Sequence, residues 1–459
     1  MSAATPARRA AFEVLRRVFE HEAWADRTFP AAAERHSLEG RERAQAQALA
    51  YGAVQRRGTT DHFIGLLSKR GTEGLDAPLV AALRLGLYEV LYSEGAEYAA
   101  VDGAVELAKG GMRSGGQRRA AGAAGLVNAV LRRAATEREA LLGSLSDDSA
   151  QDAAVAHSVP AWLARMWWEE LGAAEARSLL RAINEPAETA MRANTLRANP
   201  DALRAELDAA GEPLKGSDPS HDAHDYAGSE SEALLHPPEA IVWGGPLGAA
   251  ALRALEDGRM FAQSRGAQAV VEALDPKPGE RVLDLCAGPG VKTVALAARV
   301  GVGGEVVAVE RDPGRARQIE EMAARAGAKN VRVEATDAAG AGGDIGQGYD
   351  RVLVDPPCSG LGTLASRPDA RWRRDPDAPA RLARVQAAIL DAGVGALRPG
   401  GTIVYSTCTI SRTENEDVVD AALDANADLD LERHLDTRPD RDGTDGFYIA
   451  QIGKARSGG

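Results

Sequence analysis

Cysteine is scarce in this chain: only three occur among 459 residues, Cys286, Cys358 and Cys408. So small and odd a number cannot supply a disulfide framework, which excludes the disulfide-stapled secreted proteins. We therefore expect a reducing compartment, the cytoplasm, as the location of the protein.

Aromatic residues and long apolar runs are also few. Aromatics make up 4% of the chain, and no stretch approaches the ~18 consecutive apolar residues that a membrane helix needs. The N-terminus lacks the apolar core of a signal peptide. With 44% hydrophobic and 26% charged residues, the composition is typical of a folded globular chain, and at ~150 residues per domain its length predicts two or three domains.

Basic residues are fewer than acidic ones, which gives the chain a net charge of −13. This argues against a protein that coats nucleic acid non-specifically. Residues 1–135 nevertheless hold 19 Lys and Arg against 15 Asp and Glu, whereas the rest holds 35 against 52. Basic residues of this first part could track a phosphate backbone or form a solvated helical surface; they are Arg56-Arg57, Lys69-Arg70, Arg113, Arg118-Arg119 and Arg132-Arg133.

Hydrophobic spacing divides the chain into three parts. Residues 1–140 repeat apolar residues every three or four positions and predict an all-α domain of five to seven helices. A polar, acidic stretch over 136–152 is typical of a linker. Residues 155–262 predict a small α+β segment, with a strand over 189–196 and a helix over 200–210. Residues 263–455 form the third part.

The third part alternates strands with helices. The alternation predicts a Rossmann-like α/β domain with a parallel sheet covered on both faces. A last strand over 447–452 is expected to be antiparallel at the far end of the sheet. The other predicted strands span 281–285, 305–309, 331–334, 349–354 and 402–406.

A glycine-rich turn follows the first of these strands, over 286–292. Small residues there let a ligand approach the main chain closely. The dinucleotide fingerprint does not fit, because Thr293 stands where its third glycine would be. The Walker loop does not fit either, because its glycines are missing ahead of Lys292-Thr293. Glu310 follows the second strand, where an acid binds ribose hydroxyls, and Asp337 follows the third, where an adenine amino group would lie. Together they predict a nucleoside pocket, although each alone is compatible with a surface acid.

Two of the three thiols end neighbouring predicted strands. Cys358 follows Asp355-Pro356-Pro357, whose prolines stop the sheet ladder, and Cys408 follows the next strand. A buried free cysteine is commonly a packing residue, but two beside a ligand turn indicate chemistry. His221 and His224 have the spacing of metal ligands, yet no further ligand is near, so we predict no metal site.

Three motifs carry a family resemblance: Asp355-Pro-Pro-Cys-Ser-Gly, Tyr405-Ser-Thr-Cys-Thr and Asp284-Leu-Cys-Ala-Gly-Pro-Gly-Val-Lys-Thr. They resemble the signature motifs of the S-adenosylmethionine-dependent RNA 5-methylcytosine methyltransferases. Arg192-x-Asn194 and Gly258-x-x-x-x-Gln263 resemble the RNA-facing segment of that family. The first 135 residues look like a NusB domain. The combination resembles the RsmB/Sun-type family of small-subunit ribosomal RNA methyltransferases.

The resemblance implies a function and a set of site residues. It implies methyl transfer from S-adenosylmethionine to carbon 5 of a cytosine in ribosomal RNA, with Cys408 as the nucleophile, Cys358 assisting release, and Asp355 bonding the ring near its third nitrogen. The thiol chemistry is independently reasonable, because carbon 5 becomes nucleophilic only after a thiolate adds to carbon 6. The implied cofactor contacts are Cys286, Ala287, Gly288, Pro289, Gly290, Val291, Lys292, Glu310, Asp337 and Asp355, with Lys292 expected on the methionine carboxylate.

Three alternatives stay open at this stage. Transfer RNA could be the substrate, since the cofactor domain alone does not distinguish the RNAs. The chain could instead be an inert RNA-binding assembly or antitermination factor. Methylation of an exocyclic amine fits less well, because such enzymes place an aromatic ring where Cys358 stands. We expect a monomer, since no coiled coil or pairing surface is evident.

Overall fold

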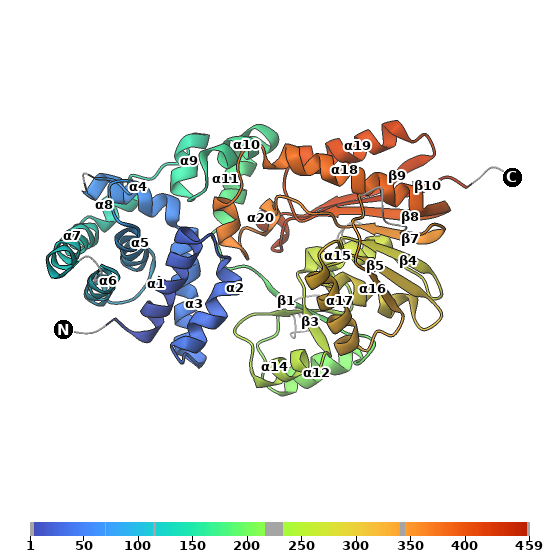
Figure 1. The fold of residues 1–459 in the computed structure, drawn as a ribbon, viewed down its shortest axis with the longest axis horizontal. Helices are drawn as coiled ribbons and strands as arrows, with labels where there is room; N and C mark the ends of the chain where they lie inside the picture. The colour runs from blue at the N-terminus through green and yellow to red at the C-terminus, as the bar shows by residue number, and fades with distance from the viewer. Residues whose placement is uncertain (1–3, 69, 113–115, 216–232, 340–344, 457–459) are drawn as a thin grey trace. The chain divides into compact units, whose positions relative to one another are not determined.

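The computed structural model describes residues 4–68, 70–112, 116–215, 233–339 and 345–456 (Figure 1). The chain forms two compact units. Unit 1 comprises residues 1–185 together with 367–375, and unit 2 comprises 186–366 and 376–459. His221 and His224 lie outside the described residues. No helix in the described ranges has both the length and the apolarity that crossing a membrane demands.

Unit 1 is helical, as the spacing of apolar residues predicts. Its first seven helices enclose one core of mostly Ala, Val and Leu side chains. Thr5 caps the first helix by accepting a hydrogen bond from the Arg8 amide, the usual role of Thr at this position. These helices are α1 (Pro6–Glu20), α2 (Ala25–Arg35), α3 (Gly40–Gln55), α4 (Arg57–Ser68), α5 (Ala77–Tyr92), α6 (Glu97–Gly111) and α7 (Gln117–Thr136).

The stretch predicted as a linker, 136–152, is instead a bonded part of unit 1. It contains α8 (Arg138–Gly143) and the start of α9 (Ala150–Ala156). Asp147 accepts hydrogen bonds from Arg181 at 2.7 Å and pairs with His157 at 3.1 Å. Its polar composition therefore reflects pairing with His157 and with α11 (Ala173–Ala182), which follows α10 (Ala161–Leu171).

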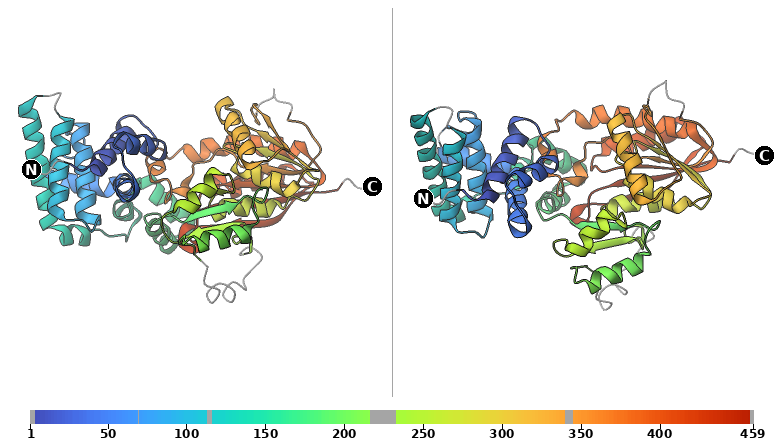
Figure 2. Two further views of the ribbon diagram at one scale, coloured as in Figure 1. Left: turned by 90° about the horizontal axis from the view of Figure 1, so that it is seen from below. Right: turned by 60° about the horizontal axis from the view of Figure 1, so that its bottom comes forward.

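Unit 2 begins with a small three-stranded sheet of order β2-β1-β3, antiparallel throughout. Its strands are β1 (Thr189–Ala193), β2 (Ala240–Trp243) and β3 (Met260–Ala262). Helices α12 (Pro200–Ala209) and α14 (Ala249–Glu256) cover one face and share its core (Figures 1 and 2).

The large sheet of unit 2 has seven strands in the order β6-β5-β4-β7-β8-β10-β9. The strands from β6 to β8 are parallel, and β10 pairs antiparallel with both neighbours. Their bounds are β4 (Arg281–Leu285), β5 (Glu305–Val309), β6 (Val331–Glu334), β7 (Tyr349–Val354), β8 (Leu397–Thr407), β9 (Leu429–Asp436) and β10 (Tyr448–Lys454).

Helices cover both faces of this sheet, because successive strand residues point to opposite sides. Val282 belongs to the core under α15 (Arg265–Leu274), α16 (Val291–Val300) and α17 (Pro313–Ala326). Leu283 belongs to the opposite core, under α18 (Ala378–Ala396) and α19 (Glu416–Ala425). Figure 1 shows the two groups of helices on either side of the strands.

The far edge of the sheet differs from the expectation. Strand β10 is antiparallel, as predicted, but it lies between β8 and β9 rather than at the end. Strand β9 was not predicted, because half of its residues are charged and only Leu429 is buried. Charged residues of this kind are common on edge strands, where they discourage pairing with another chain.

Candidate active site

The two thiols predicted at neighbouring strand ends lie together. Strands β7 and β8 are adjacent and parallel, so their carboxyl ends share one edge of the sheet. Cys358 follows β7 after the Asp-Pro-Pro segment, and Cys408 directly follows β8. Their Sγ atoms are 3.3 Å apart, and both side chains are half-buried. The Gly362 amide donates to the Cys408 carbonyl at 3.0 Å, which holds the loop after Cys358 against the end of β8.

The paired thiols are not equivalent. The hydrogen bond with Cys408, together with burial and nearby negative charge, raises the pKa of Cys358 well above its ordinary value. Within the pair, Cys358 therefore holds its proton at neutral pH. A thiolate is the nucleophilic form of cysteine, so Cys358 is held in the less nucleophilic form.

Asp355, the first residue after β7, connects the thiols to the glycine-rich turn. Lys292 donates from Nζ to one carboxylate oxygen of Asp355 at 2.7 Å, and Ser406 donates to the other at 3.2 Å. Burial alone would lower the pKa of Lys292. The charge and hydrogen bond of Asp355, and then the charge of Cys408, outweigh burial, and the net effect raises the pKa. Lys292 is therefore a half-buried ammonium that stabilises negative charge on both neighbours.

The glycine-rich turn has the strained, close-packed backbone that its composition predicts. Gly290 has φ +101°, which favours glycine, and caps α16. A Cβ atom on Gly288 would lie 2.5 Å from Oε2 of Glu310, so only glycine leaves that carboxylate undisturbed. The Ala287 amide donates to the Val309 carbonyl at 3.0 Å. These contacts form a cradle between the ends of β4 and β5.

Cys286, the third cysteine, begins this turn with φ +64°. Burial raises its pKa to about 12. It is therefore a thiol at neutral pH.

The two predicted carboxylates of the nucleoside pocket follow β5 and β6. Glu310 is 5% exposed, and its Oε1 accepts from the Asp312 amide at 3.0 Å. Asp337 is exposed, and its Oδ1 accepts from the Ala339 amide at 3.1 Å. Because the strand order is β6-β5-β4-β7-β8, the predicted residues follow five neighbouring strands along one edge. Ligands of open α/β sheets bind at this edge.

The residues that resemble an RNA-facing segment are buried. Arg192 is 5% exposed and donates to Oε1 of Gln263 at 2.7 Å and to the Val291 carbonyl at 3.2 Å. Burial lowers the pKa of Arg192 to about 10. Asn194 is fully buried and donates to the carbonyls of Gly258 and Ala326. These two side chains therefore join the small sheet to α16 and α17, and the RNA-facing role of the segment stays a prediction.

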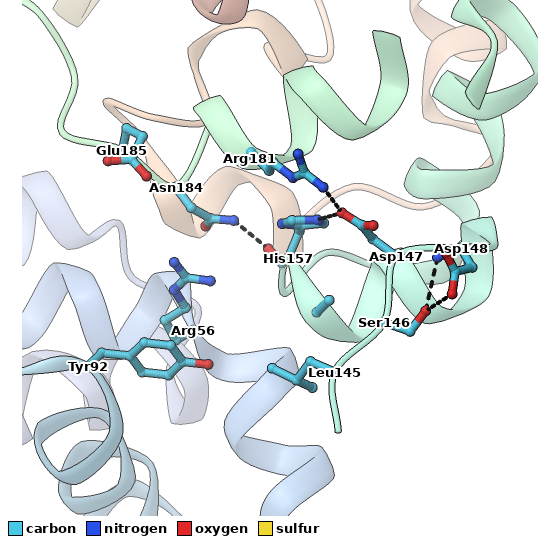
Figure 3. Close-up of a pocket in the computed structure, with 11 residues that line it drawn as sticks. Arg56, Tyr92, Leu145, Ser146, Asp147, Asp148, His157, Arg181, Asn184 and Glu185 are labelled. Atoms are coloured by element: carbon cyan, nitrogen blue, oxygen red, sulfur yellow. Dashed lines mark hydrogen bonds and ion pairs between the residues drawn. The ribbon is translucent and has the colours of Figure 1, made fainter. Parts of the chain in front are cut away.

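Unit 1 contains a separate polar pocket of about 560 Å³. Arg56 lies over the Tyr92 ring at 4.7 Å and points toward Asn184 (Figure 3). Burial lowers the pKa of His157, although Asp147 partly opposes the shift. None of the predicted cofactor or thiol residues lines this pocket. In the part of the chain that the structure describes, no three His, Cys, Asp or Glu side chains gather as a metal site.

Three family descriptions match the chain. Residues 271–453 match the 16S rRNA methyltransferase RsmB/F family, residues 5–136 match the NusB family, and residues 159–223 match the ferredoxin-like domain of RsmF/B-like methyltransferases. The last match explains the small sheet that precedes the large one.

Individual relatives agree with these matches. The chain is 37% identical over 454 residues to a protein of Mycobacterium tuberculosis (strain H37Rv) that carries a methyltransferase name, covering 95% of this chain and 89% of the relative. It is 31% identical to the ribosomal RNA small subunit methyltransferase B of Escherichia coli (strain E2348/69), over 90% of both chains.

A solved structure shares the whole fold. The crystal structure of PH0851 superposes with a TM-score of 0.80 at 24% identity, covering 99% of this chain and 100% of the other. The chain is therefore an S-adenosylmethionine-dependent methyltransferase, and it belongs to the 16S rRNA methyltransferase RsmB/F family.

Proposed function

We propose that this protein methylates carbon 5 of a cytosine in small-subunit ribosomal RNA, in the cytoplasm, through a covalent bond between Cys408 and the base. The observation that carries the proposal is the pair of thiols, 3.3 Å apart, that follows β7 and β8. The names of the relatives support ribosomal RNA as the substrate.

The thiols divide the chemistry between them. The Cys408 thiolate adds to carbon 6 of cytosine, and the electron pair displaced from the ring double bond makes carbon 5 nucleophilic. S-adenosylmethionine, when bound, would supply the methyl group from its positively charged sulfur, so that carbon 5 gains the methyl and the sulfur is left as a neutral thioether. Once Cys408 is bonded to carbon 6, its hydrogen bond and charge no longer raise the pKa of Cys358. Cys358 then releases its own proton to water and takes the proton from carbon 5. The ring double bond re-forms and Cys408 leaves as a thiolate, so each cycle releases one proton.

Asp355 and Lys292 control charge in this site. Asp355 would bond the cytosine ring near its third nitrogen, where charge accumulates as Cys408 adds. The Lys292 ammonium is bonded to Asp355 and stabilises the Cys408 thiolate before attack. Contact of Lys292 with the methionine carboxylate stays a prediction.

The cofactor would lie along the glycine-rich turn. The main chain from Cys286 to Lys292 would approach it closely, because the cradle at Gly288 and Gly290 has no room for side chains. Glu310 would accept hydrogen bonds from the ribose hydroxyls, and Asp337 would bind the adenine amino group. Glu310 is already oriented by its bond from the Asp312 amide.

The test measures methyl transfer and covalent capture in the same reactions. Purified full-length protein is incubated with radiolabelled S-adenosylmethionine and either small-subunit ribosomal RNA or transfer RNA, and RNA–protein adducts are separated on denaturing gels. We expect the wild type to methylate ribosomal RNA. Cys408→Ala should abolish transfer and adduct, whereas Cys358→Ala should retain the adduct because release fails.

Each alternative has a distinct result. Full activity of Cys408→Ala would refute the nucleophile. Methylation confined to transfer RNA would replace the substrate. Binding of RNA without methylation by the wild type would favour the assembly or antitermination factor, against which the intact pair of thiols argues.

A further inference from the structure

A buried carboxylate lies behind the two thiols. Glu414 ends the short helix η4 (Arg412–Glu414) and is fully buried. Its Oε1 accepts from the Ser359 amide at 2.8 Å and from the Gln386 side chain at 2.9 Å, and its Oε2 accepts from the Ser359 hydroxyl. All three partners are donors, so both oxygens act as acceptors, which is the bonding pattern of an ionised carboxylate.

Two hydroxyls connect this carboxylate to the residues that follow the thiols. Ser359 follows Cys358 and Thr409 follows Cys408, and their hydroxyl oxygens are 2.6 Å apart. A serine hydroxyl has a single hydrogen, and that of Ser359 is directed to Glu414. Thr409 must therefore donate to Ser359, which fixes one direction for the whole chain of hydrogen bonds.

The carboxylate itself is held firmly. The Tyr405 hydroxyl donates to the Glu414 carbonyl at 2.6 Å. Gln386, on α18, also donates to the Pro357 carbonyl at 3.1 Å and so ties Glu414 to the Asp-Pro-Pro segment. Ser359 and Gln386 are fully buried. The two thiol-bearing loops thus share one rigid support.

We propose that Glu414 is a positioning residue that sets the separation of Cys358 from Cys408, by binding Ser359 directly and Thr409 through it. This inference rests on the proposed function, because the separation matters only if both thiols act on one base. The charge of Glu414 also contributes to the raised pKa of Cys358, after the hydrogen bond with Cys408 and burial. Glu414 acts on the thiols through the residues beside them.

Glu414→Gln tests the proposal. The variant places an amide donor among donors and removes the negative charge. Displacement of a reacting group by about 1 Å costs about 100-fold in rate, so we expect kcat to fall on that scale while KM for S-adenosylmethionine stays unchanged. Because Cys358 would no longer reach the carbon 5 proton, the covalent RNA adduct should accumulate. A merely structural loss would lower the adduct together with the turnover.

Two further variants make the result decisive. Asp417→Asn is the control. It removes the charge of an exposed carboxylate in α19 that pairs with Arg412, and it should behave as wild type. Ser359→Ala keeps the hydrogen bond from the main-chain amide of residue 359 to Glu414 but removes the hydroxyl that connects Glu414 to Thr409. It should therefore accumulate adduct, and it provides the test if Glu414→Gln fails to fold. Wild-type turnover and adduct in Ser359→Ala, and in Glu414→Gln if it folds, would overturn this inference alone. An inactive wild type would overturn the proposed function as well.

Discussion

Asp284, in β4, is a buried acid whose proton links stability to pH. Its side chain is 1% exposed and accepts a hydrogen bond from the Thr293 hydroxyl at 2.7 Å. Burial, with a smaller effect of the Asp355 charge, raises its pKa to about 7 from an ordinary value of 3.8. Between these values the folded protein holds a proton that the unfolded chain has lost. Stability from this group is therefore present at low pH and is lost as pH rises toward 7.

Replacement of Asp284 by Asn should remove this dependence. The difference between the two pKa values corresponds to about 4 kcal/mol of free energy of unfolding. Relative to wild type, the free energy of unfolding of the variant should therefore increase by up to that amount between about pH 4 and pH 7. Above pH 7 the difference should stay constant. Urea unfolding at several pH values measures it. Asp391→Asn, at an exposed position of α18, is the control, and parallel pH curves for Asp284→Asn and wild type would contradict the prediction.

Lys292 should determine the pH at which the site works. Lys292→Met removes the ammonium beside Asp355 and Cys408, so Cys408 should need a higher pH to lose its proton. We expect methyl transfer near pH 7 to fall roughly 10-fold, in line with the loss of a charged partner, and to recover partly at alkaline pH. Single-turnover rates between pH 6 and 10 test this, with exposed Lys277→Met as the control. A uniform loss at every pH would assign Lys292 to cofactor binding instead.

Residue types and their order along the chain predicted much of the site, but not its supports. Strand ends gave the location of Cys358 and Cys408, because parallel strands present their carboxyl ends together. The role of Glu414 could not be predicted, because its bond to Ser359 joins residues 55 positions apart in the sequence. The partners of Arg192 could not be predicted either, since an arginine in the sequence does not indicate whether it binds a phosphate or, as here, a protein carbonyl.

At the scale of elements, the segment 367–375 is the feature that periodicity could not predict. It belongs to unit 1 although it lies within the sequence of unit 2. Arg371 is fully buried and donates to the carbonyls of Ser158 and Ile183 and to Oδ1 of Asn184. The indole of Trp372 donates to the Val54 carbonyl at 3.0 Å. Burial lowers the pKa of Arg371 to about 9.

Arg371→Met should destabilise unit 1. It removes the donor to the Ser158 carbonyl and to Oδ1 of Asn184, whereas the Ile183 carbonyl still accepts from Gln55. Each unsatisfied group costs about 1–3 kcal/mol, so we expect a loss of roughly 2 kcal/mol or more. Denaturation of the full chain, followed by the fluorescence of the tryptophans, measures the change. Arg367→Met, at the exposed start of the same segment, should be neutral. Equal effects of the two variants would show that the buried bonds are unimportant.

Regular elements were predicted most successfully where apolar spacing is continuous. The helices of residues 6–136 and the parallel strands from β4 to β8 have such spacing. Strand β9 and helices α8 and α9 lack it, because charged side chains dominate β9 and ion pairs replace apolar packing around Asp147. The division into 1–140, 155–262 and 263–455 stays a prediction.

At the scale of the whole molecule, the uneven charge suggests where RNA binds outside the site. Arg57 pairs with Asp61 and lies over Phe19 and Trp372, so it serves the fold. Arg118 and Arg132 are exposed on α7. Lys69 and Arg113 lie outside the described residues. The monomeric state stays a prediction.

Removal of the exposed arginines should reduce the salt dependence of RNA binding. Each phosphate contact contributes about 0.7 to 0.9 to the slope of log affinity against log salt concentration, so Arg118→Ser with Arg132→Ser should lower the slope by about 1.4 to 1.8. Filter binding at several salt concentrations measures it. Arg317→Ser, exposed on α17, is the matched control. An unchanged slope in the double variant would place the RNA elsewhere.

The late segment of unit 1 also has a consequence for synthesis on the ribosome. Residues 1–185 emerge first, but the side chains that complete their packing, among them Arg371 and Trp372, are translated nearly two hundred codons later. A chain stopped by a nonsense codon after residue 185 would lack these side chains and expose the surface they cover to proteases. The helical half therefore matures only when most of the methyltransferase half has been made.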